Sequence, residues 1–338
     1  MRMIENVFET ELGRAVSGDS LELMAELESQ SVDLIVTSPP FGLVRKKSYG
    51  NKDSDEYVNW FRPFAQEMSR ILKPNGSLVI DLGGAWTKGV PTKSLYQYKL
   101  LICLCDEFGF NLCQDFFWWN PSKLPTPAEW VTIRRIRVKD AVNCIWWLSP
   151  TPWPKASNRR VLSAYSKSME VLLKHGYQPR LRPSGHDIST KFQKDNGGAI
   201  PPNVLAIANT RSTDPYVRFC EANALKIHDA RFPAELPAFF VKFLSDPGDF
   251  VFDPFAGSCM TGAVSEQLGR KWMCCDLIRE FVSGGRGYFQ GDFQLGTDSS
   301  VLYEIRKPDP RPSRDPEMQL DSGREFRRSR NDDRGDVM

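Results

Sequence analysis

The sequence lacks several features that mark common classes of protein. Its eight cysteines include no Cys-x-x-Cys pair and only three histidines are present, which excludes a zinc ribbon or a disulfide scaffold. No apolar run of about 18 residues occurs, and the first residues, MRMIENVFETELGR, lack the apolar stretch of a signal peptide. We therefore expect a cytoplasmic protein with neither a metal nor a membrane partner.

A dominant charge is also missing. The 44 Lys and Arg residues are balanced by 42 Asp and Glu residues, for a formal net charge of +2. Composition alone therefore gives no sign of a nucleic-acid partner, which would have to be bound by local basic clusters. Residues 306–338 carry nine basic and eight acidic residues with few apolar ones, so we expect a disordered tail. Because its charges are balanced, the tail dilutes the average charge of the chain and obscures local basic clusters elsewhere.

What the sequence does contain is an alternation of strand-like and helix-like segments. The continuous apolar run Val32–Thr37 is typical of a buried parallel strand, and residues 57–72 have the apolar spacing of a helix. Further strands are expected at residues 15–17, 78–82, 116–119, 250–253 and 271–275, and further helices at 21–27, 95–108, 233–244 and 261–268. This rhythm predicts an α/β fold with a doubly wound, Rossmann-like parallel sheet.

Residues 150–228 differ in composition from the segments on either side. They are rich in Pro, Gly, Asn, Ser and Arg, in stretches such as TPWPKASNRR and KDNGGAIPPN. A segment of this length is too long for a passive loop in a compact domain, so we expect an insert with its own task. The chain then divides into residues 1–149, the insert 150–228, residues 229–300 and the tail 306–338.

The first segment that carries chemistry is Ser38-Pro39-Pro40-Phe41, directly after the expected strand. Parallel strands of α/β folds present ligands at their carboxyl ends. Proline has a fixed φ and no N–H, so the Ser38 hydroxyl and the Pro39 carbonyl can point outward, while Phe41 offers a flat face to a planar substrate. Acceptors aimed at the hydrogens of an aromatic amino group would localise the nitrogen lone pair. On these residues alone, a strand that ends in a Pro-rich turn remains an alternative.

The second segment is FVFDPFAGSCMTG at residues 250–262. A strand ends at Asp253, and small residues then open a helix whose N–H groups can approach a bound cofactor. Asp276 follows the next expected strand, where an acid can hold ribose hydroxyls. The segment lacks the third glycine of Gly-x-Gly-x-x-Gly and the lysine of a P-loop, which disfavours a nicotinamide-linked oxidoreductase and a P-loop enzyme. A generic tight turn stays as the alternative for this segment alone.

In this order the two segments resemble the beta-class amino-methyltransferases of DNA, in which the catalytic motif precedes the cofactor motif. The resemblance is carried by TSPPF at 37–41 and DPFAGS at 253–258, and is strengthened by HDARFPAELP at 228–237 and WNPSKLP at 119–125. It implies an S-adenosylmethionine-dependent methyltransferase fold with circularly permuted motif order and a smaller target-recognition region. Serine before Pro-Pro usually accompanies cytosine-N4 methylation in this family, and the overall spacing resembles enzymes of restriction–modification systems.

The resemblance implies a role for each matching residue. The catalytic loop would be Ser38, Pro39, Pro40 and Phe41, and the S-adenosylmethionine loop would be Asp253, Phe255, Ala256, Gly257 and Ser258. The cofactor would also be contacted at its ribose by Asp276, at its methionine side by Phe232 and Pro233, and at its adenosine by Asp19. Cys259 departs from the family, which commonly has glycine there. Because a cysteine requires an ordinary φ, we expect a reshaped loop and weaker cofactor binding.

The resemblance further implies that the target base is extruded from duplex DNA into the pocket, because an amino group inside a duplex is out of reach of a cleft. Phe41 would stack on the base, with Trp118 or Trp119 as a second wall, unless these tryptophans belong to the core. The expected DNA contacts are Arg45, Lys46 and Lys47, then Arg134 and Arg135 in the cluster 134–139, and Arg159, Arg160, Arg182 and His186 in the insert. The simpler interpretations are solvated loops, ion pairs or, for 134–139, one face of a strand.

The sequence therefore predicts a site-specific DNA methyltransferase that acts on cytosine N4 in double-stranded DNA, with S-adenosylmethionine as cofactor, close to the bacterial nucleoid. Methylation of adenine N6 and a catalytically inactive DNA-binding protein remain alternatives. Members of the family are sometimes dimers, so a homodimer stays open.

Overall fold

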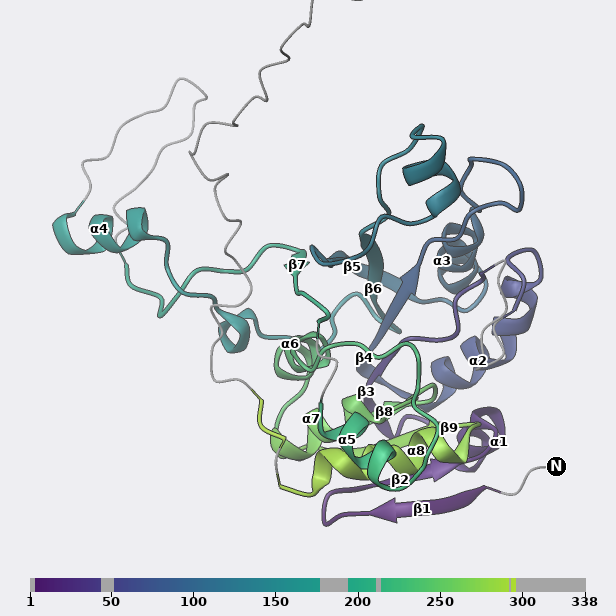
Figure 1. Ribbon diagram of the computed structural model, residues 1–338. Coiled ribbons are helices and arrows are strands. Elements are labelled where there is room, and N and C mark those ends of the chain that lie inside the picture. Colours follow the sequence, from purple (N-terminus) through teal and green to yellow (C-terminus); the bar gives the residue numbers. More distant parts are fainter. Residues whose placement is uncertain (1–3, 44–51, 177–193, 211–213, 292, 296–338) are drawn as a thin grey trace, which may run out of the picture. The chain divides into compact units, whose positions relative to one another are not determined.

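The computed structural model describes residues 4–43, 52–176, 194–210, 214–291 and 293–295. Their centre is a nine-stranded sheet in the order β1-β2-β9-β8-β3-β4-β6-β5-β7, with helices on both faces (Figure 1). The strands are β1 (Glu5–Glu9), β2 (Gly13–Ser17), β3 (Val32–Thr37), β4 (Leu72–Gly83), β5 (Asn111–Trp119), β6 (Val142–Ser149), β7 (Val204–Ala206), β8 (Phe250–Asp253) and β9 (Lys271–Asp276). Within these ranges no helix is long and apolar enough to cross a membrane.

The middle of the sheet is parallel, and antiparallel pairs lie toward both of its edges. Strands β2, β9, β8, β3 and β4 pair in parallel. Strand β6 runs antiparallel to both β4 and β5, and β1 runs antiparallel to β2. The predicted α/β, Rossmann-like fold with a parallel sheet is confirmed, and the sheet also has antiparallel pairs toward its edges, which the sequence did not predict. The physical reason is that β6 returns beside β5 without a crossover helix, which makes the pair antiparallel.

Strand β3 lies between the two larger of three hydrophobic cores that the described residues form. All six of its residues are buried. Leu34 and Val36 belong to the core on one face and Ile35 to the core on the other, as the alternation of side chains along a strand requires. The first core is covered by α5 (Pro215–Ala222), α6 (Glu235–Leu244) and α7 (Met260–Gln267), and the second by α1 (Ser20–Glu26), α2 (Tyr57–Ile71) and α3 (Tyr96–Asp106). A strand packed on both faces fixes the position of the loop that follows it.

The segment 150–228, which the composition predicts as an insert, is interwoven with the sheet. Within it, η2 (Asn158–Val161) packs on α6, β7 pairs in parallel with β5, and α5 packs on α8 (Arg279–Gly285). Helix α4 (Lys167–His175) has no buried residue. Residues near the end of this segment therefore share a core with the cofactor half of the chain. The predicted tail 306–338 lies outside the described residues.

Candidate active site

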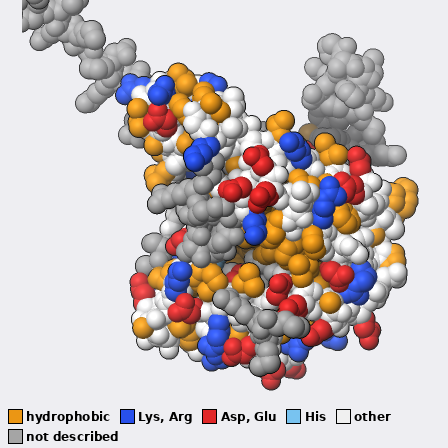
Figure 2. Space-filling view, turned by 90° about the vertical axis from the view of Figure 1, so that its right-hand side faces the viewer, with side chains coloured by type: hydrophobic (Ala, Val, Ile, Leu, Met, Phe, Trp, Pro, Cys, Tyr) orange, Lys and Arg blue, Asp and Glu red, His pale blue; other side chains and the backbone are white. Residues whose placement is uncertain are grey.

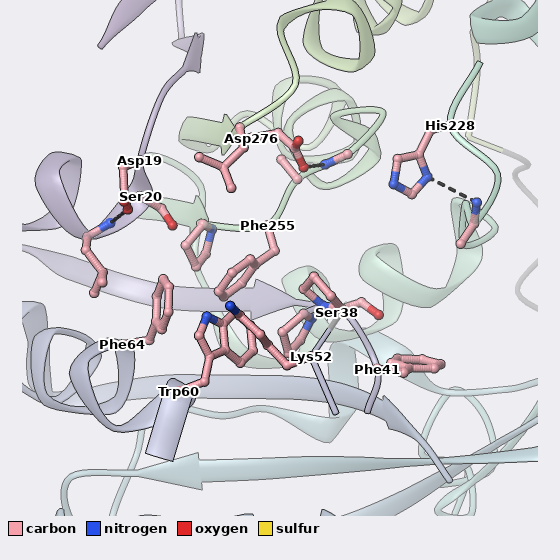
Figure 3. Close-up of a pocket in the computed structure, with 18 of the residues that line it drawn as sticks. Asp19, Ser20, Ser38, Phe41, Lys52, Trp60, Phe64, His228, Phe255 and Asp276 are labelled. Carbon is pink, nitrogen blue, oxygen red and sulfur yellow. Dashed lines mark hydrogen bonds between the residues drawn. The ribbon is translucent and has the colours of Figure 1, made fainter. Parts of the chain in front are cut away.

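A pocket of about 560 Å³ opens at the carboxyl ends of β3, β8 and β9 (Figure 3). Both segments that the sequence singles out line it: residues 38–41 follow β3, and residues 254–258 follow β8. The two strands pair in parallel, Leu34 opposite Val251, so their carboxyl ends lie side by side. Neighbouring strands thus bring together two motifs that are far apart in the chain, as α/β folds do at ligand sites.

Two aspartates line the far side of the pocket from Ser38, as Figure 3 shows. Asp276 ends β9, and its Oδ2 accepts a hydrogen bond of 2.9 Å from the Gly257 N–H. Asp19 precedes α1, and its Oδ1 accepts a hydrogen bond of 2.9 Å from the Leu21 N–H. Burial raises the pKa of Asp276, although its backbone donors lower it. Each carboxylate keeps further lone pairs for a ligand, so both predicted residues are placed to accept hydrogen bonds from hydroxyl groups.

Asp253 does not line the pocket but joins its two loops. The side chain is fully buried and accepts hydrogen bonds of 2.7 Å from Thr37 Oγ1 and 2.7 Å from Thr261 Oγ1. The Phe255 N–H donates a third, of 3.1 Å. Burial raises the pKa of Asp253 to about 6 against these donors. The sequence predicts direct cofactor contact for Asp253. The structure instead places it beneath the loop, where it holds the residue before Ser38 against the start of α7.

Cys259 adopts a backbone conformation that we did not expect. Its φ is +61° and its ψ 29°, in the left-handed region, directly before α7. The prediction of an ordinary φ is therefore wrong, whereas a reshaped loop and weaker cofactor binding stay predictions. Its side chain is fully buried, and a Cβ built on Gly285 would lie 3.0 Å from the Cβ of Cys259. Close packing against a glycine thus accommodates the cysteine, at a backbone cost of roughly 1–2 kcal/mol.

Behind Ser38, outside the set of residues that line the pocket, lies a buried acid that sequence reasoning missed. The Ser38 hydroxyl donates a hydrogen bond of 3.1 Å to Asp81 Oδ2 in β4. Asn143 in β6 donates one of 3.1 Å to Asp81 Oδ1. Burial raises the pKa of Asp81 to about 6, while Asn143, Ser38 and the positive charge of Lys123 lower it. The signal in the sequence was a charged residue inside the apolar run 78–82.

Aromatic rings form much of the pocket wall. Phe255 packs against Phe64 and Trp60 of α2, with ring centroids 4.9 and 5.9 Å apart. The sequence predicts only the first of these three residues. Phe41 lies against Gly83, where a Cβ would come within 2.4 Å of its ring, so only glycine fits beneath it. The pocket therefore has flat apolar surfaces both near Asp19 and Asp276 and near Ser38 (Figure 3).

The segment before α6 contributes one predicted residue to the pocket and one that was missed. Phe232 lines the pocket as predicted, whereas Pro233 lines a separate, smaller cavity of about 200 Å³. His228 also lines the main pocket, and its Nδ1 accepts a hydrogen bond of 3.1 Å from the Ala230 N–H. Burial and the neighbouring Arg231 lower the pKa of His228 to about 4, so the imidazole is neutral at pH 7.

The two tryptophans at the end of β5 differ in their environment. Trp118 is 7% exposed, and its Nε1 donates a hydrogen bond of 2.9 Å to the Ile207 carbonyl. Its predicted alternative role as a stacking wall is wrong, because the ring is part of the core. Trp119 is half-buried, and its carbonyl accepts a hydrogen bond of 3.1 Å from the Ile207 N–H. Neither lines the pocket.

The predicted basic cluster 134–139 is not a strand. Arg134 follows the short π-helix η1 (Glu129–Ile133), its Nε lies 2.6 Å from Glu129 Oε1, and its guanidinium lies 5.3 Å from the Trp130 ring centre. Arg135 is exposed, with φ at +55°. On the face that Figure 2 shows, Lys and Arg side chains are scattered among Asp and Glu rather than joined in one basic surface.

The remaining predicted DNA contacts fall into two groups. Arg159 is exposed in η2, and Arg160 forms an ion pair with Asp246 near the amino ends of the strands, away from the pocket. Outside the described residues lie Arg45, Lys46, Lys47, Arg182 and His186. No group of three or more His, Cys, Asp and Glu side chains that could hold a metal ion occurs in the described part of the chain.

Comparison with known proteins gives the family. Residues 32–285 match the family model N6_N4_Mtase, described as DNA methylase. The Type II methyltransferase M.PvuII of Proteus hauseri is 50% identical over 279 residues, which cover 82% of this chain and 83% of that protein. The DNA adenine methyltransferase YhdJ of Escherichia coli (strain K12) is 26% identical over 82% of this chain and 83% of its own.

Solved structures agree with this assignment. The structure of the cytosine-N4-specific PvuII DNA methyltransferase matches with a TM-score of 0.69 and 41% identity, and covers 88% of this chain and 92% of its own. The resemblance to enzymes of restriction–modification systems that the motif spacing indicates is thus confirmed. The chain belongs to the N6_N4_Mtase family of DNA methylases and is an S-adenosylmethionine-dependent DNA methyltransferase.

Proposed function

We propose that the protein transfers a methyl group from S-adenosylmethionine to the exocyclic N4 of cytosine at a short specific site in duplex DNA, as the modifying enzyme of a restriction–modification system. The observation that carries this proposal is the Ser38–Asp81 hydrogen bond, in a pocket shared with the cofactor loop. The 50% identity to a type II methyltransferase supports it.

The residues around the pocket suit S-adenosylmethionine. Asp276 and Asp19 offer carboxylate oxygens to the ribose hydroxyl groups of the adenosine. The Gly257 backbone lies next to Asp276. The rings of Phe255, Trp60 and Phe64 give an apolar surface of the kind that an adenine needs. When bound, the cofactor supplies an electrophilic methyl group on a positively charged sulfur.

At the other side of the pocket, Ser38 prepares the nucleophile. Its hydroxyl proton is directed at Asp81. The lone pairs of its Oγ are therefore left to accept a hydrogen of the target amino group, and the Pro39 carbonyl accepts the other. Both contacts favour a pyramidal nitrogen with a localised lone pair. After transfer the surplus proton can pass through Ser38 to Asp81, because a pKa of about 6 leaves that carboxylate ionised at pH 7.

The target base must leave the duplex to reach Ser38, so we propose that it is flipped into the pocket. Phe41, held against Gly83, gives it a flat surface. The second candidate is the same reaction on adenine N6, favoured by the match to an adenine methyltransferase.

Sequencing of modified DNA from cells that express the protein, with mass spectrometry of the nucleosides, tests the proposal. We expect N4-methylcytosine within one short motif. N6-methyladenine would establish the second candidate. Unmodified DNA, together with no binding of S-adenosylmethionine by calorimetry, would identify a catalytically inactive DNA-binding protein.

A further inference from the structure

The segment between β5 and β6, residues 120–141, forms an excursion at the catalytic end of the sheet. Because β6 is antiparallel to β4, its first residues lie beside the last residues of β4, with Asn143 opposite Gly83. The neck of the excursion is closed by a hydrogen bond of 2.9 Å from the Asn120 N–H to the Ala141 carbonyl. The excursion therefore leaves the sheet next to Asp81 and the ring of Phe41.

The basic residues near the neck hold the excursion in shape. Lys139 Nζ donates hydrogen bonds to the carbonyls of Pro121 and Lys123, at 3.1 and 3.3 Å. Arg137 Nη2 donates one of 2.9 Å to the Pro91 carbonyl, outside the excursion. The Asp140 side chain, in turn, forms an ion pair with Lys93. Side chains that bind backbone carbonyls on separate segments fix the loop in one conformation before any ligand arrives.

On this fixed backbone four large apolar side chains are exposed, and three of them are more than half exposed. Val138 is 86% exposed, Leu124 75% and Ile133 68%. Val138 lies between Arg137 and Lys139, both of which are tied down, and it lines an open groove of about 450 Å³ with Trp86 and Lys93. Large apolar side chains that stay exposed on a fixed backbone are available to pack against a partner.

The charge of the excursion identifies the partner. Residues 120–141 contain five Lys and Arg residues against two Asp and Glu residues, whereas the whole chain is almost balanced. Arg135 is exposed, two residues after Ile133 and three before Val138 in the sequence. Apolar side chains among cations, on an excursion that leaves the sheet next to Asp81 and Phe41, fit DNA better than a second protein surface, because phosphates meet the cations and base edges meet the apolar groups.

We propose that the excursion enters the duplex beside the target, with Val138, Leu124 and Ile133 packed against the bases that lose their stacking neighbour when the target base is extruded. The proposal rests on the proposed function and adds to it the element that stabilises the open duplex. Apolar side chains placed between base steps are how proteins offset the cost of unstacking. The recognition of the site itself is left to other residues.

The test compares serine variants of the three residues, singly and together, with Trp153→Ser. Trp153 is 85% exposed but follows β6 at the opposite end of the sheet, so it is a matched control. DNA binding is measured on two duplexes that carry the motif recognised by the enzyme. In the matched duplex the target cytosine is paired, and in the other the base opposite the target cytosine cannot pair with it. Pyrrolo-cytosine at the target position reports extrusion by its fluorescence. Calorimetry with S-adenosylmethionine shows that each variant is folded.

We expect the triple variant to bind the matched duplex about tenfold more weakly and to lose the fluorescence increase. A tenfold rise in Kd corresponds to a loss of about 1.4 kcal/mol of binding free energy, which is the size of a modest contact. Binding to the unpaired duplex should fall by less than about threefold, since extrusion there costs little. The proposal would be overturned if the affinity for both duplexes fell equally or if neither affinity fell. It would also be overturned if the variants changed only their oligomeric state, as measured by sedimentation. Methylation by the unaltered enzyme is scored separately, so a failure of the proposed function is recognised by itself.

Discussion

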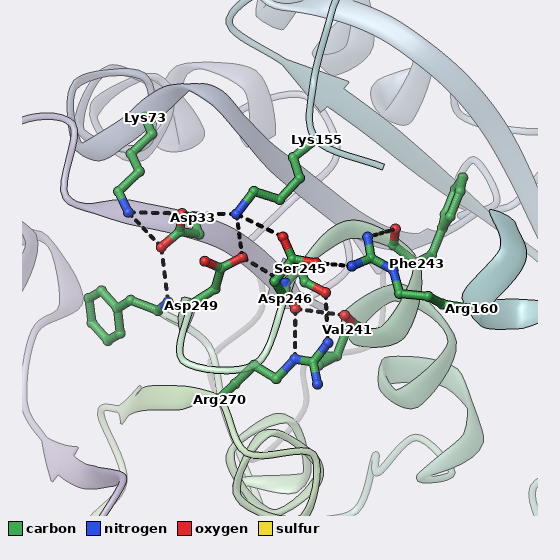
Figure 4. Close-up of polar contacts among 11 residues, drawn as sticks. Asp33, Lys73, Lys155, Arg160, Val241, Phe243, Ser245, Asp246, Asp249 and Arg270 are labelled. Carbon is green, nitrogen blue, oxygen red and sulfur yellow. Dashed lines mark hydrogen bonds and ion pairs between the residues drawn. The ribbon is translucent and has the colours of Figure 1, made fainter. Parts of the chain in front are cut away.

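At the amino ends of β3 and β8 carboxylates meet cations (Figure 4), whereas at the carboxyl ends of the sheet they meet neutral donors. Both oxygens of Asp33 lie 2.8 Å from Lys73 Nζ. Lys155 Nζ lies 2.7 Å from Asp249 and 3.4 Å from Asp246, which also pairs with Arg160. The slight burial of Asp246 opposes ionisation, yet the two cations lower its pKa.

The carboxyl ends show the opposite arrangement. Asp81 is held by a serine and an amide, Asp253 by two threonines and an N–H, and Asp276 by two N–H groups. None of the three forms an ion pair with a described residue. Burial therefore raises the pKa of each.

The difference separates stability from function within one sheet. At the amino ends the charges are neutralised by their partners and join the start of the insert to the start of two strands. At the carboxyl ends the acids are oriented but not neutralised, so they can still interact with a ligand. Replacements at the catalytic end should therefore affect methyl transfer, and replacements at the amino end should affect folding.

The largest effect is expected for Ser38→Ala. It removes the oxygen that accepts the target amino hydrogen and separates Asp81 from the substrate. The rate of methyl transfer should fall by about 10²–10³-fold or more, as for the loss of one preorganised group in other active sites. Calorimetry should find S-adenosylmethionine binding close to that of the unaltered protein. Full activity would disprove the mechanism.

Asp276→Ala is expected to weaken cofactor binding. The variant loses the carboxylate that would hold ribose hydroxyls and that supports the Gly257 backbone. The Kd for S-adenosylmethionine should rise about 10- to 100-fold, the effect of losing charge-assisted hydrogen bonds of about 1.5–3 kcal/mol. The temperature of thermal unfolding without cofactor should also fall, because the Gly257 and Ile278 N–H groups lose their acceptor. An unchanged Kd would remove Asp276 from the cofactor site.

Lys155→Met tests the ion pairs at the amino ends of the strands and is expected to affect stability rather than methyl transfer. The cation that bridges two aspartates is lost, so the free energy of unfolding should fall by about 2 kcal/mol, measured by urea denaturation. The rate of methyl transfer per folded molecule should stay the same. Lys174→Met, in the exposed helix α4, is the control and should change stability by less than about 0.5 kcal/mol. A fall in the transfer rate would show that the two ends are coupled.

The smallest effect is a dependence on pH. The pKa of Asp81 is raised from 3.8 to about 6, so the carboxylate gains its proton as the pH falls through 6. We expect transfer at saturating substrates to be constant above about pH 7, halved near 6 and about tenfold lower at 5, since one pKa unit is a factor of ten. The same shift means that the ionised carboxylate of Asp81 opposes folding above pH 6. Acidification therefore does not destabilise the protein through this residue, and unfolding caused by Asp81 cannot account for the loss of activity at low pH.

Much of the fold and one half of the catalytic site could be predicted from the sequence. Val32–Thr37 and Phe250–Asp253 are strands with the predicted bounds, because continuous apolar runs that end in Pro-containing loops leave few alternatives. The partner of Ser38 could not be predicted. Its contact with Asp81, and that of Asp81 with Asn143, depend on the register of β4 beside β3 and β6, which no local pattern encodes.

Cys259 shows a different limit of sequence reasoning. Its intrinsic preference argued for an ordinary φ, yet tertiary packing against Gly285 places it in the left-handed region. Local propensity is a preference of about 1 kcal/mol, which the packing of a buried loop can exceed.

The hydrogen bond between Thr37 and Asp253 also sets the time at which the enzyme becomes active. The two residues are 216 positions apart, and β8 is the strand that lies next to β3 on this side. A growing chain has made the loop that holds Ser38 long before the residue that anchors it exists. At about 5–20 residues per second, roughly 10–40 s of synthesis separate the two. A freshly translated molecule therefore cannot methylate DNA until nearly the whole described chain has left the ribosome.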